Sequence, residues 1–200
     1  MSVERDSVVW AALAVEGLSF SATRDRYVDA LYPYDKRADA MGMGRSQSSC
    51  GGTCEAILRA VGVECKTPYA QSFTGGRLPW LVWQRDEAQR RGAWVDARKW
   101  DARRQLPIAG DMVEIGPEAR GGAPALSHVL TIVDGGRFDC ISVDGGQPDP
   151  GNVDPKTGAR PTAIFRRARR FEERGPSLWL VDNDSARARR VVGWIDVSRL

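Results

Sequence analysis

The second half of the chain is divided into short β-branched segments, and this feature restricts the possible folds more than any other. GDMVEIG, SHVLTIVD and FDCISVDGG are separated by Gly, Pro and Asp. This pattern is typical of successive strands in an antiparallel sheet. PTAIFRRARRF predicts a further strand, and RVVGWIDVSRL predicts a last short strand and a turn. The stretch QPDPGNVDPKTGARP predicts a loop.

Helical patterns precede these strands. Residues 7–18 predict an amphipathic helix, and residues 80–91 predict another that ends at a glycine. Between them, residues 50–62 carry apolar side chains at i, i+3, i+4 and i+7 from Cys54, as one face of a helix requires. Helices followed by a sheet indicate an α+β protein. No boundary divides the chain, so we expect a single domain over residues 1–200.

The charge and composition argue against some classes of partner. The formal net charge is only +3, which is too small to indicate nucleic-acid binding. The arginine-rich runs FRRARRFEERG and SARARRVVGW contain few interleaved aromatic residues, so we interpret them as a solvated face. No apolar run reaches the length of a transmembrane segment. The sequence does not identify an immunity or carrier protein.

The N-terminal residues lack the features of a secretion signal. An apolar stretch is present, but acidic residues come early and no small-residue cleavage site follows. We therefore expect a protein that is cytoplasmic as synthesised. Delivery to the cell envelope by a non-classical or phage-lysis route stays open as an alternative. Because no signal peptide is expected, the four cysteines are expected to be thiols.

Cys50 and His128 are the residues best suited to catalysis. Cys50 stands in SSCGG at the predicted start of a helix, where the helix dipole stabilises the thiolate that acts as a nucleophile. The small neighbours Ser49 and Gly51 leave room for a substrate backbone. His128 is the only histidine in the chain and opens a predicted strand. The pair predicts a thiol nucleophile with a histidine base.

A third residue should orient the histidine, and Asp144 in ISVDGGQ is our candidate. If a three-residue loop joins the two strands, Asp134 pairs with Phe138 and Asp144 lies opposite His128. A two-residue loop would place Asp144 on the other face of the sheet. We expect Asp144 to accept a hydrogen bond from Nδ1 of His128. Gln147 is the alternative orienting residue, and otherwise it lines the substrate groove.

A metal site would compete for some of the same residues. Cys50, Cys54, Cys65 and His128 supply the ligand types of a Cys₃His zinc site. The C-x₃-C spacing and the absence of a second close pair argue against zinc. We expect no metal and no organic cofactor.

Four segments, in order, resemble the NlpC-like and CHAP-like branch of the papain-like cysteine peptidases and amidases. SSCGGTCEAILRAVGV resembles their nucleophile helix, PIAGDMVEIG the strand entry that follows, SHVLTIVD the histidine strand, and ISVDGGQ the strand with the third polar residue. The resemblance covers about residues 48–147. Ser49 replaces the Asp common before the cysteine in the NlpC branch, and Asp144 replaces its third-residue His.

The resemblance implies a papain-like α+β fold, with N-terminal helices that include the nucleophile helix packed on an antiparallel sheet. It also implies hydrolysis of amide bonds in peptidoglycan peptides. The oxyanion tyrosine of the NlpC branch has no clean match, but Tyr34 lies in a suitable loop before Cys50. Two alternatives remain: deamidation or acyl transfer by the same residues, and a catalytically silent binding or structural module.

Overall fold

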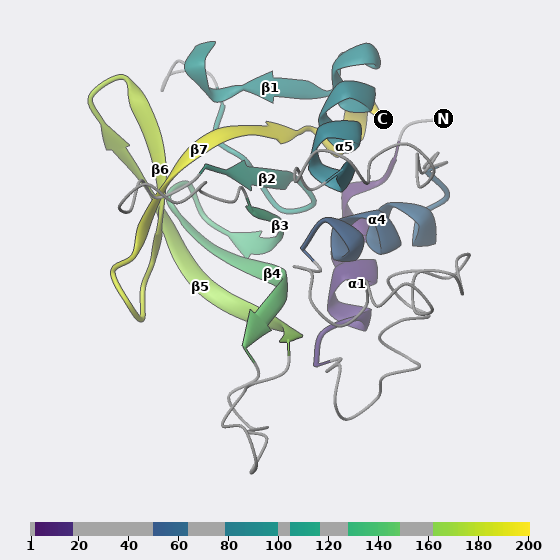
Figure 1. Ribbon diagram of the computed structural model, residues 1–200, viewed down its shortest axis with the longest axis horizontal. Coiled ribbons are helices and arrows are strands. Elements are labelled where there is room, and N and C mark those ends of the chain that lie inside the picture. The colour runs from purple at the N-terminus through teal and green to yellow at the C-terminus, as the bar shows by residue number, and fades with distance from the viewer. Residues whose placement is uncertain (1–2, 18–49, 64–78, 100–104, 117–127, 149–161) are drawn as a thin grey trace.

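The computed structural model describes residues 3–17, 50–63, 79–99, 105–116, 128–148 and 162–200 (Figure 1). Its helices are α1 (Arg5–Ala14), α4 (Cys50–Ala60) and α5 (Pro79–Arg90), with short 3-10 helices η2 (Ala97–Lys99) and η3 (Val197–Arg199). Its strands are β1 (Trp94–Asp96), β2 (Met112–Ile115), β3 (His128–Gly135), β4 (Asp139–Pro148), β5 (Thr162–Arg174), β6 (Ser177–Asp182) and β7 (Ala188–Ile195). No helix in these ranges is long and apolar enough to cross a membrane.

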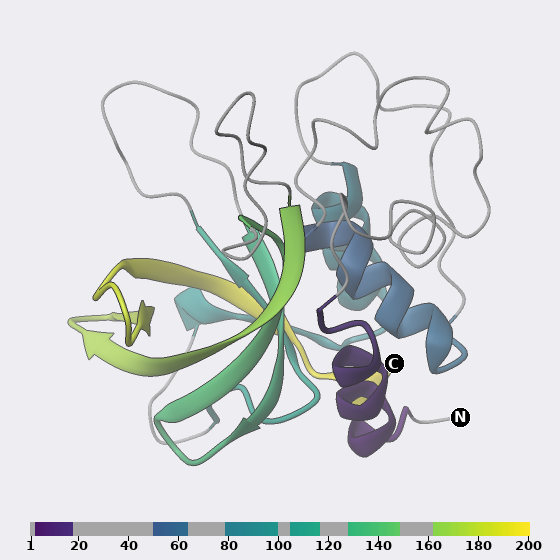
Figure 2. The same cartoon turned by 90° about the horizontal axis from the view of Figure 1, so that it is seen from below.

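The strands form a closed antiparallel barrel. Their order is β7-β2-β3-β4-β5-β6, and β6 also pairs with β7, which completes the ring. The seventh strand, β1, adds to β7 outside this ring. The long strand β5 pairs with β4 along its first part and with β6 along its last part, so its curvature turns the sheet back on itself (Figure 2). Closure leaves few unpaired strand edges.

The expected papain-like α+β fold is wrong. The structure is mostly a closed barrel of six antiparallel strands plus one strand, with few helices, rather than helices packed on an open sheet. The error has a specific source, because the sequence patterns did not predict β1 or β6. β6 is the strand that joins β5 to β7, so without it the sheet has no means of closing.

Most individual elements were nevertheless predicted correctly. The expected helices correspond to α1, α4 and α5, and five expected strands correspond to β2, β3, β4, β5 and β7. β4 continues to Pro148, so the first two residues of the expected loop, Gln147 and Pro148, belong to this strand, and the rest of that segment lies outside the described residues. The glycines after α4 and α5, Gly62 and Gly92, have φ angles of 82° and 71°, a left-handed conformation that ends a helix at little cost.

Alternate residues of each strand separate two apolar cores. The outer faces of β3 and β4 pack under α1 and α4, and this core includes Val129, Val143 and Ile57. The inner faces fill the barrel, with Leu130 and Trp194 among the buried residues. Figures 1 and 2 show α1 and α4 on one side of the barrel. Residues of β3 and β4 that point inward are therefore separated from the helices, except at the ends of the strands.

Candidate functional site

Cys50 is the first residue of α4 and is completely buried. α4 packs across β3 and β4, which brings its first turn to the end of the barrel where β3 begins. Cys54, one turn later, points into the outer core, where its sulfur lies 3.7 Å from the hydroxyl oxygen of Thr131. Burial raises the pKa of the Cys54 thiol far above its usual range, which keeps that sulfur protonated and unreactive.

His128 is the first residue of β3 and pairs with Ile115 of β2. It shares the inner face of the strand with Leu130, but its position at the strand end leaves the imidazole at the rim of the barrel. Its Nε2 lies 3.0 Å from Oδ2 of Asp144. The ring also hydrogen-bonds the side chain of Cys50. Since Nε2 is engaged by Asp144, Nδ1 is the ring atom left for the sulfur.

The structure thus brings Cys50, His128 and Asp144 together, but the ring is turned the other way from our expectation. Asp144 was expected at Nδ1 and is found at Nε2. The reason is geometric. Nε2 is the ring nitrogen farther from the histidine backbone, and Asp144 meets it inside the barrel.

A bulge in β3 decides which face Asp144 shares with His128. Near the turn, the register of β3 and β4 would place the two residues on opposite faces. Val133 has no partner in β4, and this extra residue shifts the register by one position. Beyond it Thr131 pairs with Val143, and both Asp144 and His128 point into the barrel.

The predicted hairpin register was therefore wrong, although the predicted face was right. Asp134 pairs with Ile141, not with Phe138. After the bulge the register differs from the predicted one by two residues, which leaves the facing side unchanged. Asp144 consequently meets His128 along a diagonal and not directly across the ladder.

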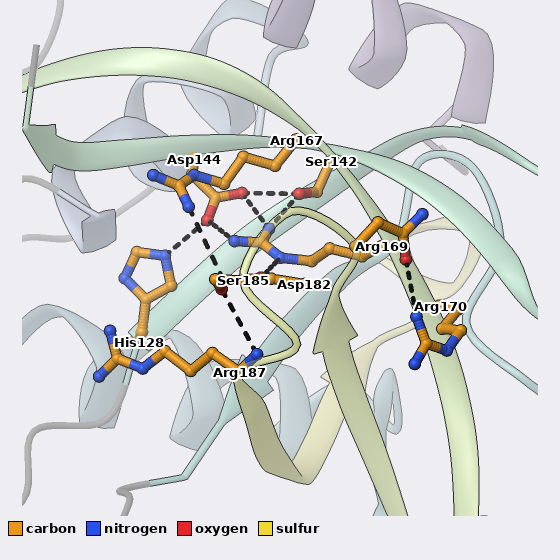
Figure 3. Close-up of polar contacts among 10 residues, drawn as sticks. His128, Ser142, Asp144, Arg167, Arg169, Arg170, Asp182, Ser185 and Arg187 are labelled. Carbon is orange, nitrogen blue, oxygen red and sulfur yellow. Dashed lines mark hydrogen bonds and ion pairs between the residues drawn. The ribbon is translucent and has the colours of Figure 1, made fainter. Parts of the chain in front are cut away.

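Asp144 is held by three further hydrogen bonds, all inside the barrel (Figure 3). Arg169 of β5 binds both carboxylate oxygens, with its two terminal nitrogens 2.6 Å from Oδ1 and 2.7 Å from Oδ2. The hydroxyl of Ser142 donates to Oδ1 at 2.7 Å. Arg169 also donates from Nε to Asp182 of β6 at 2.6 Å. We call His128, Ser142, Asp144, Arg169 and Asp182 the site cluster.

The electrostatics of the site cluster favour charged partners. Burial alone would raise the pKa of Asp144, but the charge of Arg169 and the hydrogen bond from His128 hold it well below its usual range. Burial alone would lower the pKa of His128, but hydrogen bonds with Asp144 and Cys50 and their negative charges raise it to about 9. At neutral pH the cluster therefore contains an aspartate and an imidazolium. An imidazolium beside the sulfur stabilises a thiolate in return.

Arg169, Ser142 and Asp182 were missed in the sequence. Arg169 belongs to the run interpreted as a solvated face, yet it is 3% exposed. In Figure 3 its side chain extends toward Asp144, while that of the next residue, Arg170, points away. Strand alternation was a usable signal, because Arg169 is two residues from Phe171, whose side chain fills the barrel.

The remaining predicted residues either lie outside the described residues or are described only by their position in a helix or strand. Ser49, Tyr34 and Cys65 lie outside the described residues. Gly51 is buried in the first turn of α4. Gln147 lies in β4, where it pairs with Ala163.

The described residues include three of the four cysteines, which are possible metal ligands. Cys50, Cys54 and Cys140 are free thiols. In the part of the chain that the structure describes, no group of three or more His, Cys, Asp or Glu side chains is arranged to hold a metal ion. The Cys₃His alternative includes Cys65, which lies outside these residues.

Comparisons with known proteins do not assign the chain to a family. No family model, curated protein or solved structure matches it. We therefore infer the function from the geometry and chemistry of the residues in the site.

Proposed function

We propose that this protein is a cysteine-dependent amide hydrolase, with Cys50 as nucleophile, His128 as base and acid, and Asp144 as the orienting carboxylate. One observation carries the proposal: the only histidine of the chain is hydrogen-bonded on one side to a cysteine at a helix start and on the other to a buried aspartate. A nucleophile, a base and an orienting acceptor need this order of contacts.

The protonation states suit the first step. Because the pKa of His128 is about 9, the ring is protonated at neutral pH and the sulfur beside it is stabilised as the thiolate. The N-terminal end of α4 carries the positive end of the helix dipole, which favours the same charge. The nucleophile is therefore ready before substrate binds.

The reaction then follows in two stages. The thiolate attacks the amide carbonyl, and the oxyanion of the tetrahedral intermediate develops near the start of α4. His128 transfers its Nδ1 proton to the leaving amine as the C–N bond breaks, which leaves a thioester on Cys50. The neutral imidazole next takes a proton from water, whose oxygen attacks the thioester, and the acid is released with the thiolate restored. Throughout, Asp144 holds the other ring nitrogen.

The substrate class comes from the motif resemblance. The order of cysteine, histidine and acidic residue is similar to that in peptidases of cell-wall peptides, so we propose peptidoglycan peptides as the first substrates to assay. Deamidation and acyl transfer use the same residues and differ in the acceptor of the acyl group. These alternatives are outcomes of the same experiment.

The experiment measures amine release from peptidoglycan peptides by wild-type protein, Cys50→Ser and Cys54→Ser, with mass spectrometry of the protein during turnover. We expect an acyl adduct on Cys50, and loss of turnover by at least roughly a thousandfold in Cys50→Ser. Cys54→Ser, a matched change one turn along the same helix, should retain activity. An adduct on Cys54, or activity that survives Cys50→Ser, would rule out the mechanism. An adduct resolved by an added amine and not by water would instead indicate acyl transfer.

The pH dependence has a defined direction. The pKa of His128 is raised from 6.5 to about 9, so the imidazolium that must protonate the leaving group is lost as pH rises through 9. Turnover should fall on that alkaline side. A decline centred near the usual histidine value would contradict the ion pair.

A further inference from the structure

Arg169 occupies a position that the proposed reaction does not itself require. It is almost completely buried in the barrel, where a cation is costly unless it is paired. Its guanidinium binds two carboxylates from different strands, Asp144 of β4 and Asp182 of β6, and also contacts the hydroxyl of Ser142. Among these partners, Asp144 is the one that contacts His128.

Arg169 and His128 bind the same oxygen of Asp144. A terminal nitrogen of Arg169 lies 2.7 Å from Oδ2, and Nε2 of His128 lies 3.0 Å from it. The guanidinium and the imidazolium are therefore within two hydrogen-bond lengths of each other. At that separation inside a protein, two cations repel appreciably, although the carboxylate between them holds both.

We propose that Arg169, anchored by Asp182, is a positioning residue of the Cys50–His128 site, and that it acts through Asp144 in two ways. Its planar fork fixes the carboxylate in the orientation that meets Nε2. Its charge limits how strongly that carboxylate holds a proton on the ring, so that His128 can still release the proton to a leaving group. This inference rests on the proposed hydrolase chemistry.

Few charged or titratable groups surround the His128 ring, so each of them should affect its pKa. Within the described residues, Cys50 faces the ring from α4, Asp144 from β4, and Arg169 from β5 through the carboxylate. Strand β2 places the apolar Ile115 opposite it. Farther away, Asp182 binds Arg169 and lies 3.7 Å from Arg167.

Because the chain has one histidine, its titration can be followed without ambiguity. We would label the protein with ¹³C-histidine and record the ring signals against pH by NMR. In Arg169→Met the titration midpoint should rise by roughly one pH unit or more, because a neighbouring cation is gone. In Asp182→Asn it should fall, because Arg169 loses its second counter-charge.

Two further variants separate charge from geometry. Arg169→Lys keeps the charge but not the planar fork, so its midpoint should stay near that of the wild type while turnover drops. Arg170→Met removes a cation from the next residue, on the opposite face of β5, and should leave the midpoint unchanged.

Opposite shifts in Arg169→Met and Asp182→Asn are the expected result. An unchanged midpoint in both variants, or an equal shift in Arg170→Met, would overturn the inference. If Arg169→Met does not fold, Asp182→Asn decides alone, and a midpoint that fails to fall rejects the proposal. The titration does not depend on turnover, so failure of the inference is distinguishable from failure of the hydrolase proposal, which would appear as absent amine release.

Discussion

Two clusters of this protein each join two aspartates through one arginine, yet they differ in chemistry. In the α1 cluster, Arg5 of α1 binds Asp111, which precedes β2, and Asp196, which follows β7, the latter at 2.5 Å. In the site cluster, Arg169 binds Asp144 and Asp182. The α1 cluster fastens a helix to the barrel, whereas the site cluster ends at a histidine and a thiol.

The pKa values of Asp111 and Asp144 are shifted in opposite directions. Burial raises the pKa of Asp111 to about 6, and the backbone N–H of Ile108 and the charge of Arg5 only partly offset that effect. The pKa of Asp144 is held far lower, because a bidentate arginine and His128 both stabilise its charge. A buried arginine–aspartate group is thus not functional in itself. The histidine and the cysteine beside it distinguish the site.

Replacing His128 should remove that distinction and give the largest effect. His128→Gln leaves Asp144 and Arg169 paired but takes away the base, so turnover should fall by at least roughly a thousandfold. Circular dichroism should show an intact fold, because the amide can still meet Asp144. Retained hydrolysis in this variant would mean that the site cluster, like the α1 cluster, has only a structural role.

The second largest effect is a difference in turnover between matched substitutions in the two clusters. Asp144→Asn should lower turnover by roughly tenfold to a hundredfold, less than loss of Cys50, because an amide can still orient the ring but cannot stabilise its charge. Asp111→Asn should leave turnover near that of the wild type. Kinetics of both variants on one substrate would measure the difference. Equal turnover in the two variants would mean that Asp144 is structural.

Removal of Arg5 should affect stability and not activity. Arg5→Met leaves the buried carboxylate of Asp111 without its ion pair, while Asp196 keeps Arg199, and this should lower the free energy of unfolding by about 3 kcal/mol. Chemical denaturation would measure this loss. Turnover per folded molecule should not change. A fall in turnover that exceeds the unfolded fraction would show that the α1 cluster also acts on the site.

The smallest effect concerns stability against pH. The pKa of Asp111 is raised in the folded state, so that state binds a proton more readily than the unfolded chain does. Its ionisation therefore destabilises the fold as pH rises from about 4 to about 6, by about 3 kcal/mol at most. Subtracting the curve of Asp111→Asn from that of the wild type would isolate this contribution. An opposite slope would mean that Arg5 outweighs burial.

The sequence allowed the local elements and the proximity of Cys50 and His128 to be predicted, but not the closure of the sheet. Helical spacing identified α4, and a cysteine at its start with a single histidine pointed to the site. The short strand β6 lies between two turns and gave too little pattern to be recognised. Closure depends on the pairing of β6 with both β5 and β7 and on the non-local pairing of β7 with β2, which no residue pattern encodes.

The finer geometry of the site was hidden for a related reason. The bulge at Val133 lies within the β3–β4 hairpin, and the burial of Arg169 depends on carboxylates from β4 and β6. An arginine-rich run suits a solvated face in most proteins. Here one of those arginines faces inward because Asp144 and Asp182 provide two carboxylates inside the barrel.

In the proposed mechanism, Cys50 and His128 form a thiolate–imidazolium pair in the resting protein. The most direct measurement is the ultraviolet absorbance of thiolate as a function of pH in the wild type, Cys50→Ser, Cys54→Ser and His128→Gln. We expect the absorbance of one thiolate at neutral pH in the wild type and in Cys54→Ser. This absorbance should be lost in Cys50→Ser and in His128→Gln. A wild-type protein whose thiolate absorbance appears only at alkaline pH, with no difference in Cys50→Ser, would contradict it.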